Sequence, residues 1–203
     1  MWTRFVILIG LLFWGGCNAA PQPDLRDGDI IFQTSTSSQS EALQRATGSR
    51  YTHMGIIFIE NGEPYVFEAV GPVRRTALQE WVNRGVDGRF VIKRLKDAEA
   101  LLSVDNVSKL RQEAENYIGL PYDHYFEWSD DRIYCSELVW KIYKRAFDIE
   151  IGQLERFSDF NLTDPVVAAK LRERFGDEVP EQEVVISPSG VFDSHLLVTV
   201  SAN

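Results

Sequence analysis

Residues 133–139, IYCSELV, place a cysteine, Cys135, in the first turn of a predicted helix. Ser136 and Glu137 favour a first helical turn, and apolar residues then recur at helical spacing as far as Ala146. The positive end of a helix dipole stabilises a thiolate, so a cysteine at this position is a candidate nucleophile. The alternative is that Cys135 is a small buried hydrophobic residue, as most free cysteines are.

A hairpin is predicted from two strands, 53–59 and 65–70, that flank the pair Asn61-Gly62. Asn-Gly between two apolar runs is the strongest short-range signal for a two-residue hairpin turn. With that turn, Glu60 faces Glu63 across the hairpin. The register of every other pair in the hairpin follows from this one.

In this register Gly55 lies opposite Glu68, and His53 lies diagonally from Glu68 on the same face. Diagonal neighbours are about 7–8 Å apart at the backbone, which allows a Glu–imidazole hydrogen bond. A catalytic histidine needs such an acceptor on its second ring nitrogen. We therefore predict that His53 is a base oriented by Glu68, and that Gly55 leaves room for the start of the Cys135 helix. The alternatives are a strand-end histidine bonded to backbone and a surface carboxylate on an edge strand.

The composition is that of a globular protein of one domain, with 203 residues, 44% hydrophobic and 25% charged. The formal net charge is −9, and no basic stripe is present. An acidic chain of this kind is a poor candidate for binding nucleic acid. We find no metal-binding pattern, no glycine-rich phosphate loop and no signal for a cofactor.

The first 20 residues are expected to be a signal segment, with residues 21–203 forming a single domain. An apolar run, 5–14, follows a positive residue and is too short to span a bilayer comfortably. Cys17 follows two glycines, as in a bacterial lipoprotein box, although Trp14 stands where such boxes prefer Leu. Lipidation of Cys17 would tether the protein to a membrane. Cleavage after Ala20 and retention as an uncleaved anchor are the alternatives.

The cysteine count strengthens the functional interpretation of Cys135. The chain has two cysteines, Cys17 and Cys135. If Cys17 is lipidated or removed, the mature domain has one thiol and cannot form an internal disulfide. A lone thiol in an exported protein is unusual, and catalysis is the most natural reason for it.

Further elements are predicted from periodicity and turn residues. Strands are expected at 30–32, 90–95, 184–186 and 196–200, and helices at 41–47, 78–84, 103–118 and 165–175. Between them, residues 122–132 form an aromatic and acidic loop that leads into Cys135. This loop either lines a substrate cleft beside the thiol or anchors itself on the core. His124 within it is an alternative base, although no strand fixes it.

Five motifs occur in an order that carries a family resemblance: GDIIF at 28–32, YTHMGI at 51–56, FEA at 67–69, YD at 122–123 and YCSEL at 134–138. Together they resemble the circularly permuted papain-like cysteine hydrolases of the NlpC superfamily, the YiiX/YaeF-like group. The resemblance covers roughly residues 24–147.

The resemblance implies an α+β fold in which the helix bearing the cysteine packs against a small antiparallel sheet or partial barrel bearing the histidine. It implies Cys135 as the nucleophile, His53 as the base and Glu68 as the third polar residue. Tyr134 precedes the nucleophile, as in that group. We assign Tyr134 to substrate binding, together with Tyr122 and Trp128 of the aromatic loop.

The function expected from these features is that of an exported cysteine peptidase or amidase of the bacterial cell envelope, acting on an amide such as a cell-wall peptide. A lipid-directed thioesterase, amidase or acyltransferase is the second hypothesis. An inactive lipoprotein that binds lipid or peptide is the third. A peptide-amine site should show an acid that captures an ammonium group, whereas a lipid site should show an open apolar groove.

Overall fold

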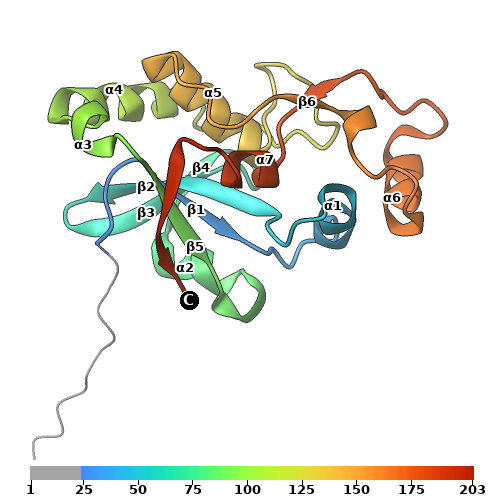
Figure 1. The fold of residues 1–203 in the computed structure, drawn as a ribbon, viewed down its shortest axis with the longest axis horizontal. Helices are drawn as coiled ribbons and strands as arrows, with labels where there is room; N and C mark the ends of the chain where they lie inside the picture. The colour runs from blue at the N-terminus through green and yellow to red at the C-terminus, as the bar shows by residue number, and fades with distance from the viewer. Residues whose placement is uncertain (1–23) are drawn as a thin grey trace, which may run out of the picture.

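The computed structural model describes residues 24–203, and its centre is a six-stranded sheet (Figure 1). The strand order is β4-β3-β2-β1-β5-β8, and every neighbouring pair is antiparallel. The strands are β1 (Asp29–Gln33), β2 (His53–Glu60), β3 (Glu63–Glu68), β4 (Arg74–Ala77), β5 (Val91–Leu95) and β8 (Leu197–Ala202). Two short strands, β6 (Glu155–Arg156) and β7 (Val184–Val185), pair separately.

Helices cover both faces of this sheet, so the described chain has the expected α+β architecture (Figure 1). They are α1 (Ser40–Thr47), α2 (Leu78–Asn83), α3 (Ala98–Leu101), α4 (Val104–Glu115), α5 (Cys135–Phe147), α6 (Pro165–Phe175) and α7 (Pro188–Phe192). Two single-turn 3₁₀ helices lie at Val86–Gly88 and Phe157–Asp159. None of the helices within residues 24–203 is long and apolar enough to cross a membrane.

The two faces of the sheet carry different cores. On one face, Ile56 and Phe67 of the sheet pack in the same buried cluster as Leu138 of α5. On the other face, Ile57 and Val66 pack with Trp81 of α2. Because side chains alternate along a strand, His53 and Glu68 belong to the face that α2 covers.

The hairpin of β2 and β3 has the predicted register, since Glu60 pairs with Glu63 and Ile56 pairs with Phe67. Asn61 has φ 53° and Gly62 has φ 85°, so both central residues adopt the left-handed conformation that a type I′ turn requires. The turn chemistry therefore fixed the register, as the sequence indicated.

The expected role of Gly55 was wrong. A Cβ at Gly55 would lie 2.5 Å from Cγ1 of Val66 and 2.6 Å from the backbone oxygen of Phe67. The missing side chain therefore permits the close approach of β3. The glycine makes room for a neighbouring strand, where we expected it to make room for the start of α5.

Some elements were not predicted from the sequence, namely β4, α3, β6 and α7. Residues 187–190 lie between the strands predicted at 184–186 and 196–200, but Pro188 begins α7 and the Ser187 hydroxyl accepts a hydrogen bond from the Gly190 N–H at 2.9 Å. Serine before proline is a recognised helix start, and α7 is short enough to be missed. The predicted signal segment at 1–20 and Cys17 lie outside the described residues.

Candidate active site

Cys135 is the first residue of α5, with Tyr134 as its N-cap. The thiol is free and 4% exposed. The Glu137 carboxylate accepts a hydrogen bond from the Tyr134 N–H at 3.4 Å, which helps to fix the start of the helix. The first N–H groups of a helix have no partner within the helix, so the backbone around Cys135 offers free donors beside the sulfur.

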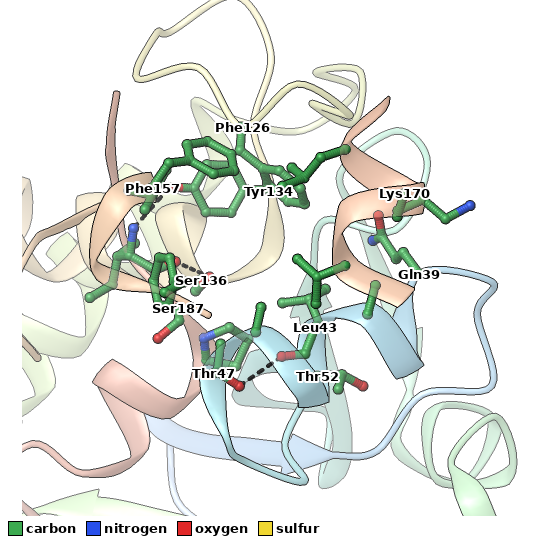
Figure 2. A pocket seen from close by; sticks show the side chains of 18 of the residues that line it. Gln39, Leu43, Thr47, Thr52, Phe126, Tyr134, Ser136, Phe157, Lys170 and Ser187 are labelled. Atoms are coloured by element: carbon green, nitrogen blue, oxygen red, sulfur yellow. Dashed lines mark hydrogen bonds between the residues drawn. The ribbon is translucent and has the colours of Figure 1, made fainter. Parts of the chain in front are cut away.

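The first turn of α5 is anchored to the segment between β7 and α7. The Ser136 hydroxyl donates to the backbone oxygen of Ile186 at 2.7 Å. The Ile186 N–H in turn donates to the Tyr134 hydroxyl at 3.0 Å. These two bonds are drawn as dashed lines in Figure 2, and they hold the turn that carries the thiol.

His53 and Glu68 interact as the hairpin register predicted. Nε2 of His53 donates to Oε2 of Glu68 at 2.6 Å, and both side chains are buried. The imidazole also stacks on Trp81, with ring centroids 5.7 Å apart and an angle of 25° between the planes. The ring of His53 is therefore held on one edge and on one face.

Glu68 is 0% exposed and is surrounded by donors. Its other oxygen, Oε1, accepts from the Thr76 hydroxyl at 2.6 Å and from the Arg84 guanidinium. Burial alone would raise the pKa of Glu68, but the contacts with His53, Thr76 and Arg84 outweigh burial and lower it. Glu68 is thus held as a carboxylate.

The protonation of His53 reflects both of its neighbours. Burial would lower the pKa of His53, but hydrogen bonding and charge from Cys135 and Glu68 outweigh it and raise the pKa to about 9. Because Nε2 is engaged by Glu68, Nδ1 is the nitrogen left for the sulfur. One imidazole is thus influenced by both a thiol and a carboxylate, an arrangement that can support nucleophilic catalysis.

Cys135 opens into a cavity with about 760 Å³ of space between its walls, the open mouth included. The walls come mainly from α1, the 122–134 segment, the 157–162 segment, α6 and the β7–α7 segment. They are mostly apolar: Ala42, Leu43, Ala46, Phe126, Tyr134, Phe157, Phe160, Leu162, Val167, Leu171, Val185, Ile186 and Pro188. Figure 2 shows Phe126 and Tyr134 on one side of the cavity and Leu43 on the other. Within residues 24–203, no Asp or Glu lines it.

His53 opens instead into a neighbouring polar cleft, which is lined by the serine- and threonine-rich loop after β1, Arg84 and His124. The residues common to the cavity and the cleft are Gln39, Thr52, Tyr122, Lys170 and Arg174. The sulfur and the imidazole therefore lie where an apolar space and a polar space adjoin.

The three residues assigned to substrate binding have different surroundings. Tyr122 lines both spaces, and its hydroxyl accepts from Nε2 of Gln39 at 3.1 Å. Burial raises the pKa of Tyr122, so its hydroxyl stays neutral and can donate. Tyr134 lines the cavity, with its ring 5.1 Å from that of Phe126.

Trp128 lies outside the cavity and the cleft. Its ring packs at 5.2 Å from that of Trp140, with the Lys141 ammonium 4.9 Å from its centroid. The aromatic loop thus both lines the cavity and anchors itself on the core. The alternative base, His124, is an exposed residue on the wall of the polar cleft.

Sequence reasoning missed Thr76, Arg84 and Gln39, and although it predicted the helix at 165–175, it did not place α6 at the cavity. Thr76 lies on β4, a four-residue strand after Gly71-Pro72, and Arg84 follows a short helix. The stretch RRTA has no apolar–polar alternation, and Thr76 is its single buried residue, so the sequence carried no periodic signal for β4. No local signal indicates that α6 packs beside α1 across the cavity.

Comparisons with known proteins show the family to which the chain belongs. Residues 24–201 match the family described as permuted papain-like amidase enzyme, YaeF/YiiX, C92 family. The chain is 50% identical over 174 residues to a protein called YiiX from Escherichia coli strain K12, which covers 86% of this chain and 85% of that protein.

A solved structure is also similar: the crystal structure of YiiX from Escherichia coli O157:H7, with a TM-score of 0.84 and 48% identity. The match covers 88% of this chain and 97% of that one. That protein is described as a metalloprotein. Within residues 24–203 of this chain, no group of three or more His, Cys, Asp or Glu side chains is placed to hold a metal ion. By sequence and by fold, the chain belongs to the permuted papain-like amidase family YaeF/YiiX.

Proposed function

We propose that this protein is a cysteine amidase with Cys135 as nucleophile, His53 as general acid and base, and Glu68 as the orienting acid. The observation that carries the proposal is the buried His53–Glu68 hydrogen bond of 2.6 Å, on a histidine whose pKa is raised by Cys135 and Glu68. A buried imidazole with a fixed acceptor on Nε2, and with a thiol close enough to raise its pKa, is suited to nucleophilic catalysis.

The reaction begins with attack of the Cys135 sulfur on the amide carbonyl carbon, which forms a C–S bond and places the negative charge on oxygen. The backbone N–H of Cys135 stabilises this oxyanion, because it lies in the first turn of α5. Protonated His53 then gives its proton to the amine as the C–N bond breaks. A water molecule, deprotonated by His53, hydrolyses the thioester and restores the thiol.

The cavity favours an apolar acyl group over a cell-wall peptide. An ammonium group of a peptide would need an acid, and within residues 24–203 the cavity wall beside Cys135 contains none. Glu173 lines the neighbouring cleft, but it already pairs with Lys170 at 2.6 Å. The apolar walls suit a hydrocarbon chain. We therefore place the acyl part of an acyl amide in the cavity. Export to the cell envelope and a membrane tether at Cys17 are part of the same proposal, since both would bring the enzyme close to lipid.

Hydrolysis of an N-decanoyl amide with a chromogenic amine tests the proposal. We expect turnover by the native chain, and a loss of at least about 10²-fold for Cys135→Ala and for His53→Ala. His195→Ala is the control, because His195 is exposed and lines neither the cavity nor the cleft, and it should retain activity. Full activity of Cys135→Ala would refute the mechanism. Binding of the amide without turnover would favour an inactive lipid-binding protein.

A further inference from the structure

Arg174 of α6 lies on the boundary between the apolar cavity and the polar cleft, since it lines both. Its guanidinium is held in place by two neutral groups. One N–H donates to Oε1 of Gln39 at 3.1 Å, and the guanidinium carbon lies 4.7 Å from the centroid of the Phe126 ring. The cation is thus positioned by an amide and an aromatic face.

No carboxylate within residues 24–203 forms an ion pair with Arg174. In this respect Arg174 differs from Arg84 and Lys170, the other two cations that line the site. Arg84 is bonded to Glu68. Lys170 pairs with Glu173 at 2.6 Å, and Figure 2 shows the Lys170 side chain pointing away from the cavity. Burial lowers the pKa of Arg174, as expected for a cation that has lost water without gaining an ion pair. A ligand anion would offset this cost.

The orientation of the substrate follows from the positions of Cys135 in the apolar cavity and His53 in the polar cleft. The acyl carbon becomes bonded to Cys135, which lines the apolar cavity. The leaving amine takes its proton from His53, which lines the polar cleft. An amide bound for reaction therefore spans the boundary, with its amine side in the cleft, where Arg174 is the cation without an acidic partner.

We propose that Arg174 binds an anionic group on the leaving amine, so that the substrates are fatty-acyl amides of amino acids or of similar anionic amines. This inference rests on the proposed function and specifies its substrate class. A planar guanidinium with free N–H groups suits bidentate binding of a carboxylate or a phosphate. Arg174 then acts as a specificity residue at the end of the substrate opposite the acyl chain.

Binding to the Cys135→Ala protein tests this inference without any need for turnover. Isothermal titration calorimetry would compare N-decanoylglycine with the neutral N-decanoylethanolamine. N-decanoylaminomethylphosphonate replaces the carboxylate by a phosphonate and shows which anion is preferred. We expect at least one of the two anions to bind about tenfold or more tightly than the neutral amide.

Arg174→Gln in the same background should remove this preference, while the affinity for the neutral amide stays within about threefold. Arg174→Lys keeps the charge and should retain part of the preference, which separates loss of charge from loss of packing. Arg172→Gln is the matched control, because Arg172 is an exposed arginine of α6 that does not line the cavity or the cleft. It should bind as the parent does.

Equal binding of anionic and neutral amides by the parent, or an anion preference that survives in Arg174→Gln, would overturn the inference. Either result leaves the proposed amidase activity intact, because that is measured by turnover of the native chain. Conversely, a native chain that binds the anionic amide tightly but hydrolyses no amide would refute the amidase and keep Arg174 as an anion receptor.

Discussion

Glu68 and Glu137 are both 0% exposed, yet their surroundings shift their pKa values in opposite directions. The pKa of Glu68 is lowered, because the contacts with His53, Thr76 and Arg84 outweigh the effect of burial. The pKa of Glu137 is raised to about 7, because burial outweighs its pairing with Lys141 at 2.8 Å. Burial is the same in the two cases, so the number and kind of donors decide the charge.

The comparison supports assigning Glu68, and not Glu137, to the proposed chemistry. Glu68 faces the imidazole and is held ionised, so it can orient and stabilise an imidazolium. Glu137 faces Lys141 and the Tyr134 N–H, so it supports the start of α5. Lys141 is itself buried, and it also bonds Asp130 of the aromatic loop at 2.9 Å. Glu137 is therefore part of the scaffold of the site.

The largest expected difference between the two acids is in activity. Glu68→Gln removes the charge that stabilises protonated His53, so kcat/KM should fall by about 10²-fold or more. Glu137→Gln keeps the shape of the side chain and lies away from the imidazole, so kcat/KM should fall by less than about threefold. Steady-state hydrolysis of the same acyl amide measures both. A larger loss for Glu137→Gln would reverse the assignment.

His53, the partner of Glu68, and Glu137 should each change the free energy of unfolding over a different pH range. The pKa of His53 is raised from 6.5 to about 9, so its stabilisation is full below about pH 6.5 and is lost as pH rises through about 9. The pKa of Glu137 is raised from 4.5 to about 7, so its ionisation lowers stability as pH rises from about 4.5 to 7.

Urea unfolding as a function of pH measures these contributions. We expect His53→Gln to lose the alkaline decrease in the free energy of unfolding, on the order of 3 kcal/mol. Glu137→Gln should lose only the decrease in the free energy of unfolding that occurs between about pH 4.5 and 7. Identical slopes in the native chain and in His53→Gln above pH 7 would show that His53 is not protonated in the folded protein.

A smaller effect on stability and activity is expected when Thr76, one of the hydrogen-bond donors to Glu68, is replaced. Thr76→Val removes the 2.6 Å hydrogen bond to Oε1 but leaves the bond to Arg84. The free energy of unfolding should fall by about 1 kcal/mol and kcat/KM by a few-fold. Thr76→Ser retains the hydroxyl and serves as the control. If Val and Ser behave alike, the hydroxyl has no part in holding Glu68.

The two parts of the proposed catalytic constellation, the His53–Glu68 pair and the helix that begins at Cys135, were predictable because each depends on short-range rules. Asn61-Gly62 set the hairpin register, and that register placed His53 and Glu68 on one face, where they form a hydrogen bond. The helix that begins at Cys135 followed from its residue types and its 3.6-residue spacing. Each inference needed only neighbours within one hairpin or one helix.

The residues around the proposed catalytic groups were harder to predict from the sequence, because their positions depend on contacts between segments distant in the chain. Arg174 reaches Gln39 across 135 positions of the chain, and Ile186 binds the Tyr134 hydroxyl across 52. The buried position of Lys141 also contradicts its polar character, and it is explained by Glu137 and Asp130. Such pairings appear only once the fold brings the segments together.

The most direct test of the central claim is the pH dependence of Cys135 alkylation by iodoacetamide, with and without His53→Ala. The Cys17→Ser background leaves Cys135 as the single thiol of the sequence. We predict rapid labelling below about pH 7 in the parent, and a large loss of that rate in His53→Ala. Labelling that is slow in both proteins, and that rises only near about pH 8.5, would show that His53 does not activate Cys135.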